Sequence, residues 1–578
     1  MRLFQKYAAA LAVLSALACA LAAPYLVPIN PDSPVYRSAA LPLLLLLACT
    51  APAREALRRA DRRTLVCALA FGLLLALCLS LGAELTVYER LLPGRGSLLR
   101  RLAVPLLATP LLGLLAARLM DLRLGTGDKK ALPALAWGGL LLLLWLPVLL
   151  AYWPGMLGYD FAGEYAQRWQ GYANLHPLLH SALQNGIIAL GERLHSPNLG
   201  LLMMTVLQMS LFALALGRAC RLAARLGGRG AGLALLLLFG LHPIFSTLAC
   251  SMTKDTLYAA ALLTLCLDMA YLLCGGRMTR GLSVRFVLCV VAVCGMRTNG
   301  FVALLALPFF LLVLPRKRRA LVLCLAGLAA AGATQGMLTL VLRPAAFPSF
   351  QFFSLPAQQL VRARAAGTLS PEQAQALEGW YTDPAGLAVH PHLADPAKGY
   401  LDRTRLQTSG ADFLALWRDA AKSSALPYAE AFLLLNIGSW YPDDKSHATL
   451  YPDVSWNDKG YLQTQELDVP GFKTRCLLPA VRELMERVCR RNAHQKLPVL
   501  SLLAAPGTPL LLLVFALFAL LSRGRGRLAP ALLAPLLLWA SYLLGPGAVP
   551  RYALPLFCLA PLALVFALSR EPWDAEEG

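Results

Sequence analysis

The stretch that decides the fold begins at residue 134. Residues 134–153 read ALAWGGLLLLLWLPVLLAYW, and four residues later the chain continues as GYDFAGE at 158–164. A run of about 20 mostly apolar residues crosses a bilayer as a helix. Two carboxylates, Asp160 and Glu164, follow at the edge of this run, about one helical turn apart. The run predicts a membrane span, and Asp160 either caps the next helix or does chemistry at the membrane surface.

The whole chain has the composition of a membrane protein. Of its 578 residues, 58% are hydrophobic and 15% are charged, with a mean hydropathy of +0.58. Soluble proteins carry roughly a quarter charged residues. We therefore expect an all-α polytopic membrane protein with about 14 transmembrane helices. The expected spans lie near 7–28, 37–53, 64–84, 102–120, 131–151, 199–218, 229–250, 255–274, 283–296, 299–314, 319–341, 497–521, 528–546 and 551–568.

The distribution of Lys and Arg predicts the orientation. Basic residues gather in alternate loops, above all REALRRADRR (54–63), PRKRR (315–319) and SRGRGR (522–527). Short cytoplasmic loops are enriched in these residues. We expect a bacterial cell (inner) membrane protein with both termini in the cytoplasm. The net charge of +21 then follows from membrane topology, and no nucleic-acid partner is expected.

Loop lengths divide the chain into four parts. Two connections that are expected outside the cell are too long for turns, and the longer one is polar enough to fold as a mostly helical extracytoplasmic domain. The expected parts are a block of about four spans (1–130), a seven-span module (131–341) with the outer loop 152–198, the extracytoplasmic domain (343–496), and about three spans with a short cytoplasmic tail (497–578).

The expected outer domain carries two local signals. Ser370, Pro371 and Gln373 are spaced as a helix cap, a first-turn proline and the partner of a capping box. Cys476 and Cys489 lie in a compartment that favours oxidation, so they either form a disulfide or remain two thiols.

The outer loop 152–198 holds the first group of candidate site residues. After Asp160, four aromatic residues recur at helical spacing, which predicts an interfacial helix whose rings lie at headgroup depth. They are Phe161, Tyr165, Trp169 and Tyr172. A second helix is expected from His176, with Pro177 at its first position. His176 and His180 have the i, i+4 spacing that can share a metal ion, although such a pair is more often structural.

A second group lies at the outer ends of later spans. Asp255 suits a helix N-terminus, whereas Lys254 beside it is disfavoured there unless an anion such as phosphate binds. Arg297 lies in an expected outer turn with Asn299, and Arg551 lies at the mouth of the last span. Arginine holds phosphate through two parallel hydrogen bonds. Snorkelling or interface anchoring is the alternative for all three cations.

These segments together resemble the GT-C superfamily of integral membrane glycosyltransferases. The superfamily includes the protein O-mannosyltransferases and the lipid A aminoarabinose transferases, and the chain is most similar to an uncharacterised bacterial branch. The resemblance covers about residues 131–568. It rests on GYDFAGE (158–164), NLHPLLH (174–180), MTKD (252–255), GMRTNG (295–300) and PRYALPLF (550–557).

The resemblance implies roles for particular residues. Asp160 matches the loop acid that acts as general base or helps to hold a divalent metal ion (Mg or Mn), and His176-Pro177 matches a histidine-proline step of related loops. Beside the resemblance, we keep His176 as a candidate metal ligand and Glu164 as a second catalytic candidate. The cations match the positions that hold the phosphate of a polyprenyl-phosphate sugar donor. They are Lys254, Arg297 and Arg551. The neighbouring residues Asp255, Asn299 and Tyr552 join the site. The chain lacks the second acidic pair of some mannosyltransferases, which leaves metal dependence open.

The implied function is transfer of a sugar from a polyprenyl-phosphate donor to an extracytoplasmic glycan or protein acceptor. Signatures of soluble enzymes, such as a P-loop, DxD, GxSxG or HExxH, are missing from the sequence. The rivals are a transporter or lipid flippase, a non-catalytic envelope assembly protein, and a transferase of a non-sugar group. Transporters tend to show internal repeats, and none is visible here. Trp380-Tyr381 and Trp440-Tyr441 either stack on sugar rings or pack inside the outer domain.

Overall fold

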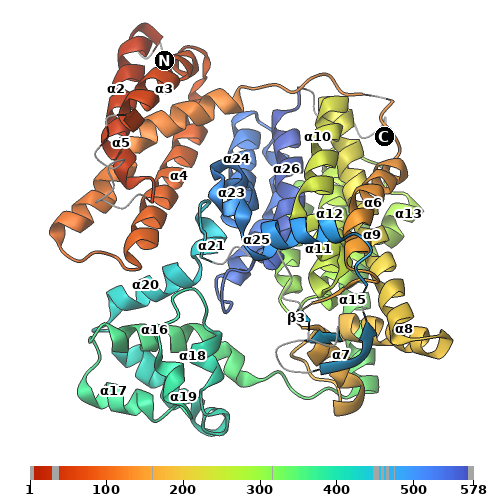
Figure 1. Ribbon diagram of the computed structural model, residues 1–578. Helices are drawn as coiled ribbons and strands as arrows, with labels where there is room; N and C mark the ends of the chain where they lie inside the picture. Colours follow the sequence, from red (N-terminus) through yellow and green to blue (C-terminus); the bar gives the residue numbers. More distant parts are fainter. Residues whose placement is uncertain are drawn as a thin grey trace.

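The described part of the chain is mostly helical with very little sheet, which confirms the all-α prediction (Figure 1). The computed structural model describes residues 5–28, 38, 40–128, 130–158, 160–314, 317–446, 455–456, 461–463, 468–473 and 475–570. Most of the expected cytoplasmic tail lies outside these residues, as do parts of the expected outer domain.

Five N-terminal elements form a block at the upper left of Figure 1. They are α2 (Ala8–Ala22), η1 (Ala23–Tyr25), α3 (Ala40–Arg59), α4 (Arg62–Tyr88) and α5 (Arg95–Met120). Helices α4 and α5 approach closely because Gly72 faces Gly113, where a Cβ atom on Gly72 would come within 2.5 Å of the Gly113 nitrogen. Phe71 packs edge-on against Phe515, with ring centroids 5.2 Å apart, and thereby joins the block to the rest of the protein.

A large helical bundle follows. Its N-terminal part consists of α6 (Ala134–Ala151), α7 (Phe161–Gln170), α8 (Leu178–Leu194), α9 (Pro197–Gly227), α10 (Arg229–Leu241), α11 (Pro243–Cys250), α12 (Lys254–Leu273), α13 (Arg280–Gly295), η2 (Gly300–Ala306), α14 (Leu307–Val313) and α15 (Lys317–Leu342). Its C-terminal part consists of η6 (Ala493–Lys496), α23 (Pro498–Ala504), α24 (Gly507–Ser522), η7 (Gly526–Leu528), α25 (Ala529–Tyr542), η8 (Pro550–Ala553) and α26 (Leu554–Leu568). Helix α12 is the most enclosed of the membrane-length helices, with 89% of its apolar window buried.

Eight helices in the described part of the chain are long and apolar enough to cross a membrane, or nine if the bent pair α10–α11 is one span. The chain is therefore a membrane protein with several apolar transmembrane-length helices. All 14 expected spans lie mainly on helical segments, but α13, α24 and α25 have only 16, 16 and 14 residues. A perpendicular span needs about 20 residues, so the figure of 14 spans stays a prediction.

The segment after α15 forms a smaller helical body with its own core, at the lower left of Figure 1. It contains η3 (Ser349–Phe353), α16 (Ser354–Ala365), α17 (Pro371–Glu378), η4 (Pro384–Leu387), α18 (Asp395–Gly399), α19 (Arg403–Ala420) and α20 (Ala425–Leu435). The short helix α21 (Ile437–Trp440) follows and packs against α24 and α4. The capping box predicted at Ser370 and Gln373 is present. Trp380 is buried in this core, edge-on to Phe413, and Tyr441 lies against Gly82 of α4. Packing, and not a sugar-stacking surface, therefore accounts for these two rings.

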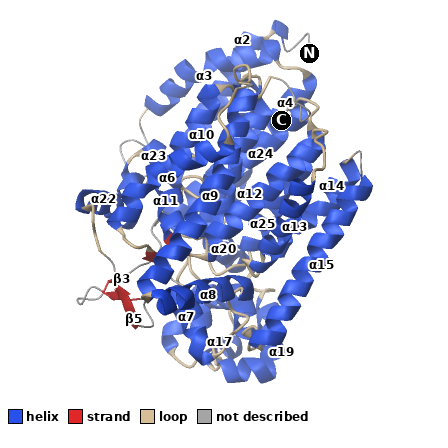
Figure 2. Cartoon of the chain, turned by 90° about the vertical axis from the view of Figure 1, so that its right-hand side faces the viewer, coloured by secondary structure: helices blue, strands red, loops and turns tan. Residues whose placement is uncertain are grey.

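Two small sheets interrupt the helices. Strands β1 (Met156–Leu157) and β2 (Ser251–Met252) pair in parallel. Strands β3 (Ser455–Trp456), β4 (Tyr461–Gln463) and β5 (Asp468–Lys473) form an antiparallel sheet that the sequence analysis did not anticipate (Figure 2). It is followed by α22 (Pro479–Met485) and a π-helical turn, η5 (Glu486–Arg490). Cys476 and Cys489 are not joined to each other by a disulfide, so the disulfide alternative is wrong.

Candidate functional site

The parallel strand pair β1–β2 brings the two halves of the site together. Met156 pairs with Ser251 and Leu157 with Met252, so the chain leaves both strands in the same direction. Asp160 follows the first strand after three residues and Lys254 follows the second after two. Gly158 permits this approach, because a Cβ atom there would lie 2.4 Å from the carbonyl oxygen of Met252. The glycine that opens the GYDFAGE motif is therefore a packing requirement.

Asp160 lies between two cations from distant parts of the chain. Lys254 Nζ donates to its Oδ2 atom at 2.9 Å, and Arg551 Nη1 donates to the same oxygen at 3.1 Å. The carboxylate side chain is 21% exposed. Burial by itself would raise the pKa of Asp160, but the charges of Arg551 and Lys254 outweigh burial and hold the pKa well below its usual range. Asp160 is ionised in this arrangement.

Glu164 lies on α7, one turn after Asp160. It is buried, and both of its carboxylate oxygens contact other side chains. Its Oε2 atom lies 2.7 Å from His180 Nδ1 and accepts a hydrogen bond from Ser181 Oγ at 3.3 Å. Its Oε1 atom lies 3.6 Å from His176 Nδ1 and 3.7 Å from Lys254 Nζ. Burial opposes ionisation, but His180 and Lys254 overcome it and lower the pKa of Glu164 to about 2.

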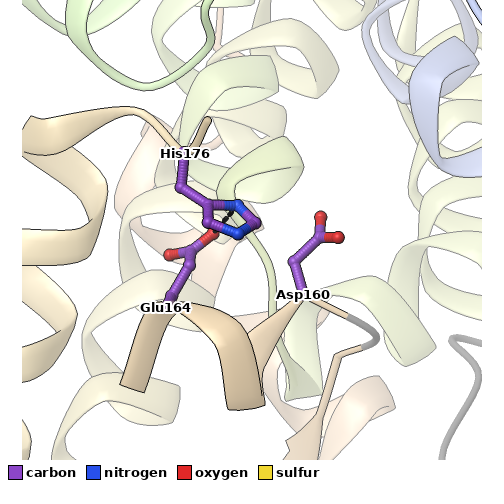
Figure 3. A group of neighbouring side chains, drawn as sticks. All are labelled: Asp160, Glu164 and His176. Carbon is purple, nitrogen blue, oxygen red and sulfur yellow. Dashed lines mark ion pairs between the residues drawn. The ribbon is translucent and has the colours of Figure 1, made fainter. Parts of the chain in front are cut away.

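His176 completes a compact group with the two carboxylates, as Figure 3 shows. One ligand atom from each of Asp160, Glu164 and His176 lies within 4.8 Å of the others. Burial lowers the pKa of His176, and the nearby Glu164 carboxylate opposes that shift. Lys254 Nζ is close to all three groups, since it also lies 3.5 Å from His176 Nδ1. The Lys254 ammonium group therefore lies within 4 Å of all three potential metal ligands.

Asp255 and Arg297 form a second layer of charged residues next to the Asp160 cluster. Asp255, the second residue of α12, is fully buried and forms an ion pair with Arg297. Arg551 Nε lies 3.9 Å from the other Asp255 oxygen, so Arg551 contacts both aspartates. Arg297 also lies 4.6 Å from the ring centroid of Tyr552, and further tyrosine rings surround it. These are Tyr258 and Tyr542, at 5.9 and 5.2 Å.

Asn299 connects this layer to α25. Its side-chain oxygen accepts from Arg297 Nε at 3.2 Å, and its Nδ2 atom donates to Ser541 Oγ at 2.8 Å. All nine residues that the sequence analysis singled out for the site therefore lie in one continuous network of described contacts. They are Asp160, Glu164, His176, Lys254, Asp255, Arg297, Asn299, Arg551 and Tyr552.

Three local expectations hold only in part. Asp160 is at the N-cap position of α7, as the sequence indicated, but among the described residues its side chain makes no capping hydrogen bond and pairs with Lys254 and Arg551 instead. Helix α8 begins at Leu178, so Pro177 precedes it and His176 does not cap it. Half of the expected aromatic surface is internal, because Phe472 of β5 packs edge-on against the rings of Phe161 and Tyr165, whereas Trp169 is exposed.

Several residues of the network were missed or misread. His180 was weighed as a metal-binding partner of His176 or as a structural residue, and the structure places it against Glu164, a contact that the sequence analysis did not name. Tyr542 and Ser541 lie on an apolar span where no charge pattern marks them. Arg168 and Glu192, which form a pair at 2.7 Å and tie α7 to α8, could have been found because both are charged residues on neighbouring amphipathic helices.

Comparison with known proteins places the chain in a family. A family model described as "Family of unknown function (DUF6020)" matches residues 170–577. Neither the curated proteins nor the solved structures contain a match. The matched segment includes Lys254, Arg297 and Arg551, whereas Asp160 and Glu164 precede it. Because the model matches well over half of the sequence, the chain belongs to this family of unknown function, DUF6020.

Proposed function

We propose that this protein is a GT-C-type glycosyltransferase with about 14 spans in the bacterial cell membrane. It transfers a sugar from a polyprenyl-phosphate donor to a glycan or protein acceptor on the extracytoplasmic side. One observation carries the proposal. A partly exposed carboxylate, Asp160, lies between two cations, Lys254 and Arg551, which come from the ends of two different membrane helices. A base next to phosphate-binding cations is what such a transfer needs.

The proposed reaction is a displacement at the sugar carbon that bears the phosphate. The acceptor hydroxyl oxygen forms a bond to this carbon, and the bond from the carbon to the phosphate oxygen breaks. The hydroxyl proton passes to the Asp160 carboxylate, and the electron pair of the broken bond stays on the departing polyprenyl phosphate. Lys254 and Arg551 stabilise the negative charge that develops there.

The ion pairs of Asp160 suggest how donor binding activates the base. With Lys254 and Arg551 paired to it, the pKa of Asp160 lies well below its usual range, and such a carboxylate is a weak base. A donor phosphate that draws both cations toward itself removes their stabilisation of the Asp160 anion. The pKa then rises, because burial is no longer offset. Base strength is thereby linked to the presence of donor.

Glu164 and Arg297 have supporting roles in this proposal. Both Glu164 oxygens contact neighbouring side chains, so Glu164 positions His176, His180 and Lys254. Arg297 is 7% exposed, and its charge is matched by Asp255. We assign Arg297 to holding the second layer in place, and leave phosphate binding to Lys254 and Arg551.

A divalent metal ion fits the arranged residues poorly. Asp160, Glu164 and His176 offer three ligand atoms, but the Lys254 ammonium group lies within 4 Å of each residue. A divalent cation among the same atoms would be repelled by that charge. No step of the proposed mechanism therefore goes through a metal ion.

The test is Asp160→Asn in the full-length protein. Loss of the proton acceptor should lower transfer from radiolabelled polyprenyl-phosphate hexoses by ~10²–10⁴-fold, while membrane insertion and thermal stability are largely kept. Asp412→Asn, an exposed aspartate on α19, is the matched control and should remain active. A folded Asp160→Asn protein with full activity would refute the assignment. Movement of the labelled lipid across vesicles without release of sugar would instead identify the flippase alternative.

A further inference from the structure

A cavity of about 360 Å³ lies at the far end of α12 from the Asp160 cluster. Asp268 lines this cavity and follows Asp255 by 13 residues on the same helix. This separation corresponds to roughly 20 Å along the helix axis. The charged residues that line the cavity come from three elements and the loop before α13. They are Arg218, Arg221, Arg225, Asp268, Arg277 and Arg285. The expected orientation places this end in the cytoplasm.

The charges around this cavity do not balance. Asp268 is fully buried and accepts from Arg218 Nη2 at 2.7 Å and from Arg285 Nε and Nη2 at 2.9 and 2.8 Å. Within the part of the chain that the structure describes, Arg221, Arg225 and Arg277 have no carboxylate partner. Five arginines against one aspartate leave a net charge of +4.

Three guanidinium nitrogens at the cavity are buried without a hydrogen-bond partner among the described residues. They are Arg218 Nη1, Arg221 Nε and Arg225 Nε. A buried donor on a charged group that lacks a partner is costly. Arginines that only mark the cytoplasmic side of a membrane extend into water, where such nitrogens are solvated. Topology alone therefore does not account for this group, whereas a bound anion would satisfy both the charge and the donors.

We propose that this cavity binds a phosphate-bearing anion of the pyrophosphate class. Forked guanidinium groups match phosphate oxygens, and several unneutralised arginines favour a ligand with more than one negative charge. The volume lies within the usual range for small-molecule sites. None of the charged lining residues contacts the Asp160 cluster, so this site goes beyond the proposed transferase function and does not depend on it.

Two sources supply this chemistry on the expected cytoplasmic side. One is the headgroup of a phospholipid that carries two phosphates, such as cardiolipin, in the adjacent leaflet, and the other is a soluble diphosphate. Both present oxygens with negative charge at the depth of the helix ends. The experiment below separates them.

The full-length protein in phosphatidylcholine nanodiscs is titrated with sodium pyrophosphate by calorimetry. The double variant Arg221→Gln/Arg225→Gln should bind at least about tenfold more weakly, because each loss removes a charge-assisted hydrogen bond. It leaves Arg218 and Arg285 on Asp268, so the fold should persist. The double variant Arg54→Gln/Arg62→Gln removes two exposed arginines from the same expected face and should bind as the wild type does.

The lipid source is tested by native mass spectrometry after purification with cardiolipin. Retention of this lipid by the wild type and its loss from Arg221→Gln/Arg225→Gln supports the headgroup; pyrophosphate binding without lipid retention supports the soluble ligand. Equal binding by wild type and variant, or no binding of either ligand by the wild type, would overturn the proposal. If the double variant is unstable, Arg277→Gln, an exposed rim residue, replaces it and should weaken binding in the same direction.

Discussion

Glu164 has both carboxylate oxygens in contact with side chains of the protein, and this makes it a determinant of stability. Its Oε2 atom contacts His180 and Ser181, and its Oε1 atom faces His176 and Lys254. An acid so surrounded stays ionised at physiological pH. Asp160 differs because it is 21% exposed and its partners are the two cations of the proposed phosphate site. One acid holds the site together, and the other is available to react.

The pH dependence of the free energy of unfolding should reveal the contribution of Glu164. Its pKa is about 2 when folded and about 4.5 when unfolded, so its stabilising contribution is complete above pH 4.5 and is lost as the pH falls toward 2. Glu164→Gln should lower the free energy of unfolding by ~3–5 kcal/mol at neutral pH, because it removes a buried negative charge that faces Lys254 and contacts the buried side chain of His180. The variant should also lose stability less steeply in acid. Thermal denaturation in detergent from pH 7 to pH 3 measures both, and parallel curves for variant and wild type would contradict the role.

Lys254 and Arg551 should contribute to the affinity of the protein for the polyprenyl-phosphate donor. Lys254→Ala or Arg551→Ala leaves Asp160 with its other cation, so the fold should persist. Binding of polyprenyl phosphate should weaken about tenfold or more in each, because each loses a charge-assisted contact. Fluorescence quenching or calorimetry with polyprenyl phosphate in nanodiscs measures the affinity. Arg343→Ala, an exposed arginine after α15, is the control, and an affinity equal to that of the control would exclude both cations from phosphate binding.

At the scale of elements, the N-terminus of α12 is the joint on which the site depends. Strand β2 precedes it and pairs with β1, which brings in the outer loop. Asp255 then binds Arg297 from the turn after α13, and Asn299 of that turn binds Ser541 on α25. Four segments that are distant in the sequence meet there. The site therefore should be rigid where α12 begins.

Breaking this joint should destabilise the protein. Arg297→Gln removes the main partner of a fully buried aspartate, so the free energy of unfolding should fall by ~3–5 kcal/mol. The comparison is Arg364→Gln, which breaks an exposed ion pair with Glu378 and should cost less than about 1 kcal/mol. Thermal or denaturant unfolding of both variants in detergent gives the difference. Similar small losses in the two would mean that the Asp255–Arg297 pair is not a structural joint.

At the scale of the whole molecule, two charged clusters lie at opposite ends of α12. The cluster around Asp160 is at its start and the arginine-lined cavity is near its end. The helices between them are apolar and long enough to cross a bilayer. The two clusters therefore should lie on opposite sides of the membrane, with the expected outer domain on the side of Asp160.

Reporter insertions test this orientation. Alkaline phosphatase folds to an active enzyme only outside the cytoplasm. It should be active when inserted after Gly367, in the turn between α16 and α17, and inactive after Gly275, in the loop between α12 and α13. The physical reason is that Lys and Arg are concentrated in the loops expected in the cytoplasm, which include the loop between α12 and α13. The reverse pattern of phosphatase activity in bacterial cells would mean that the protein has the opposite orientation in the membrane.

The sequence was informative about site residues because charge is conspicuous on an apolar background. Lys254, Asp255 and Arg551 stand out at the ends of hydrophobic runs, and the structure brings them together. The local role of Asp160 was read less well, since a carboxylate before a helix looks like a cap until its partners are known. The antiparallel sheet β3–β5 escaped notice because strands of two to six residues leave little periodic pattern.

The sequence by itself determined that this is an all-α membrane protein, and which charged residues are candidates for its site. The physical reason is local: long apolar runs must satisfy their backbone hydrogen bonds within helices, and charge at their ends is unusual enough to notice. Only the tertiary structure decided which acid pairs with which cation. Asp160 and Lys254 are 94 residues apart and Asp160 and Arg551 are 391 apart, and their meeting depends on two-residue strands and one close glycine contact. Contacts of that kind arise from packing between distant segments, which no local pattern records.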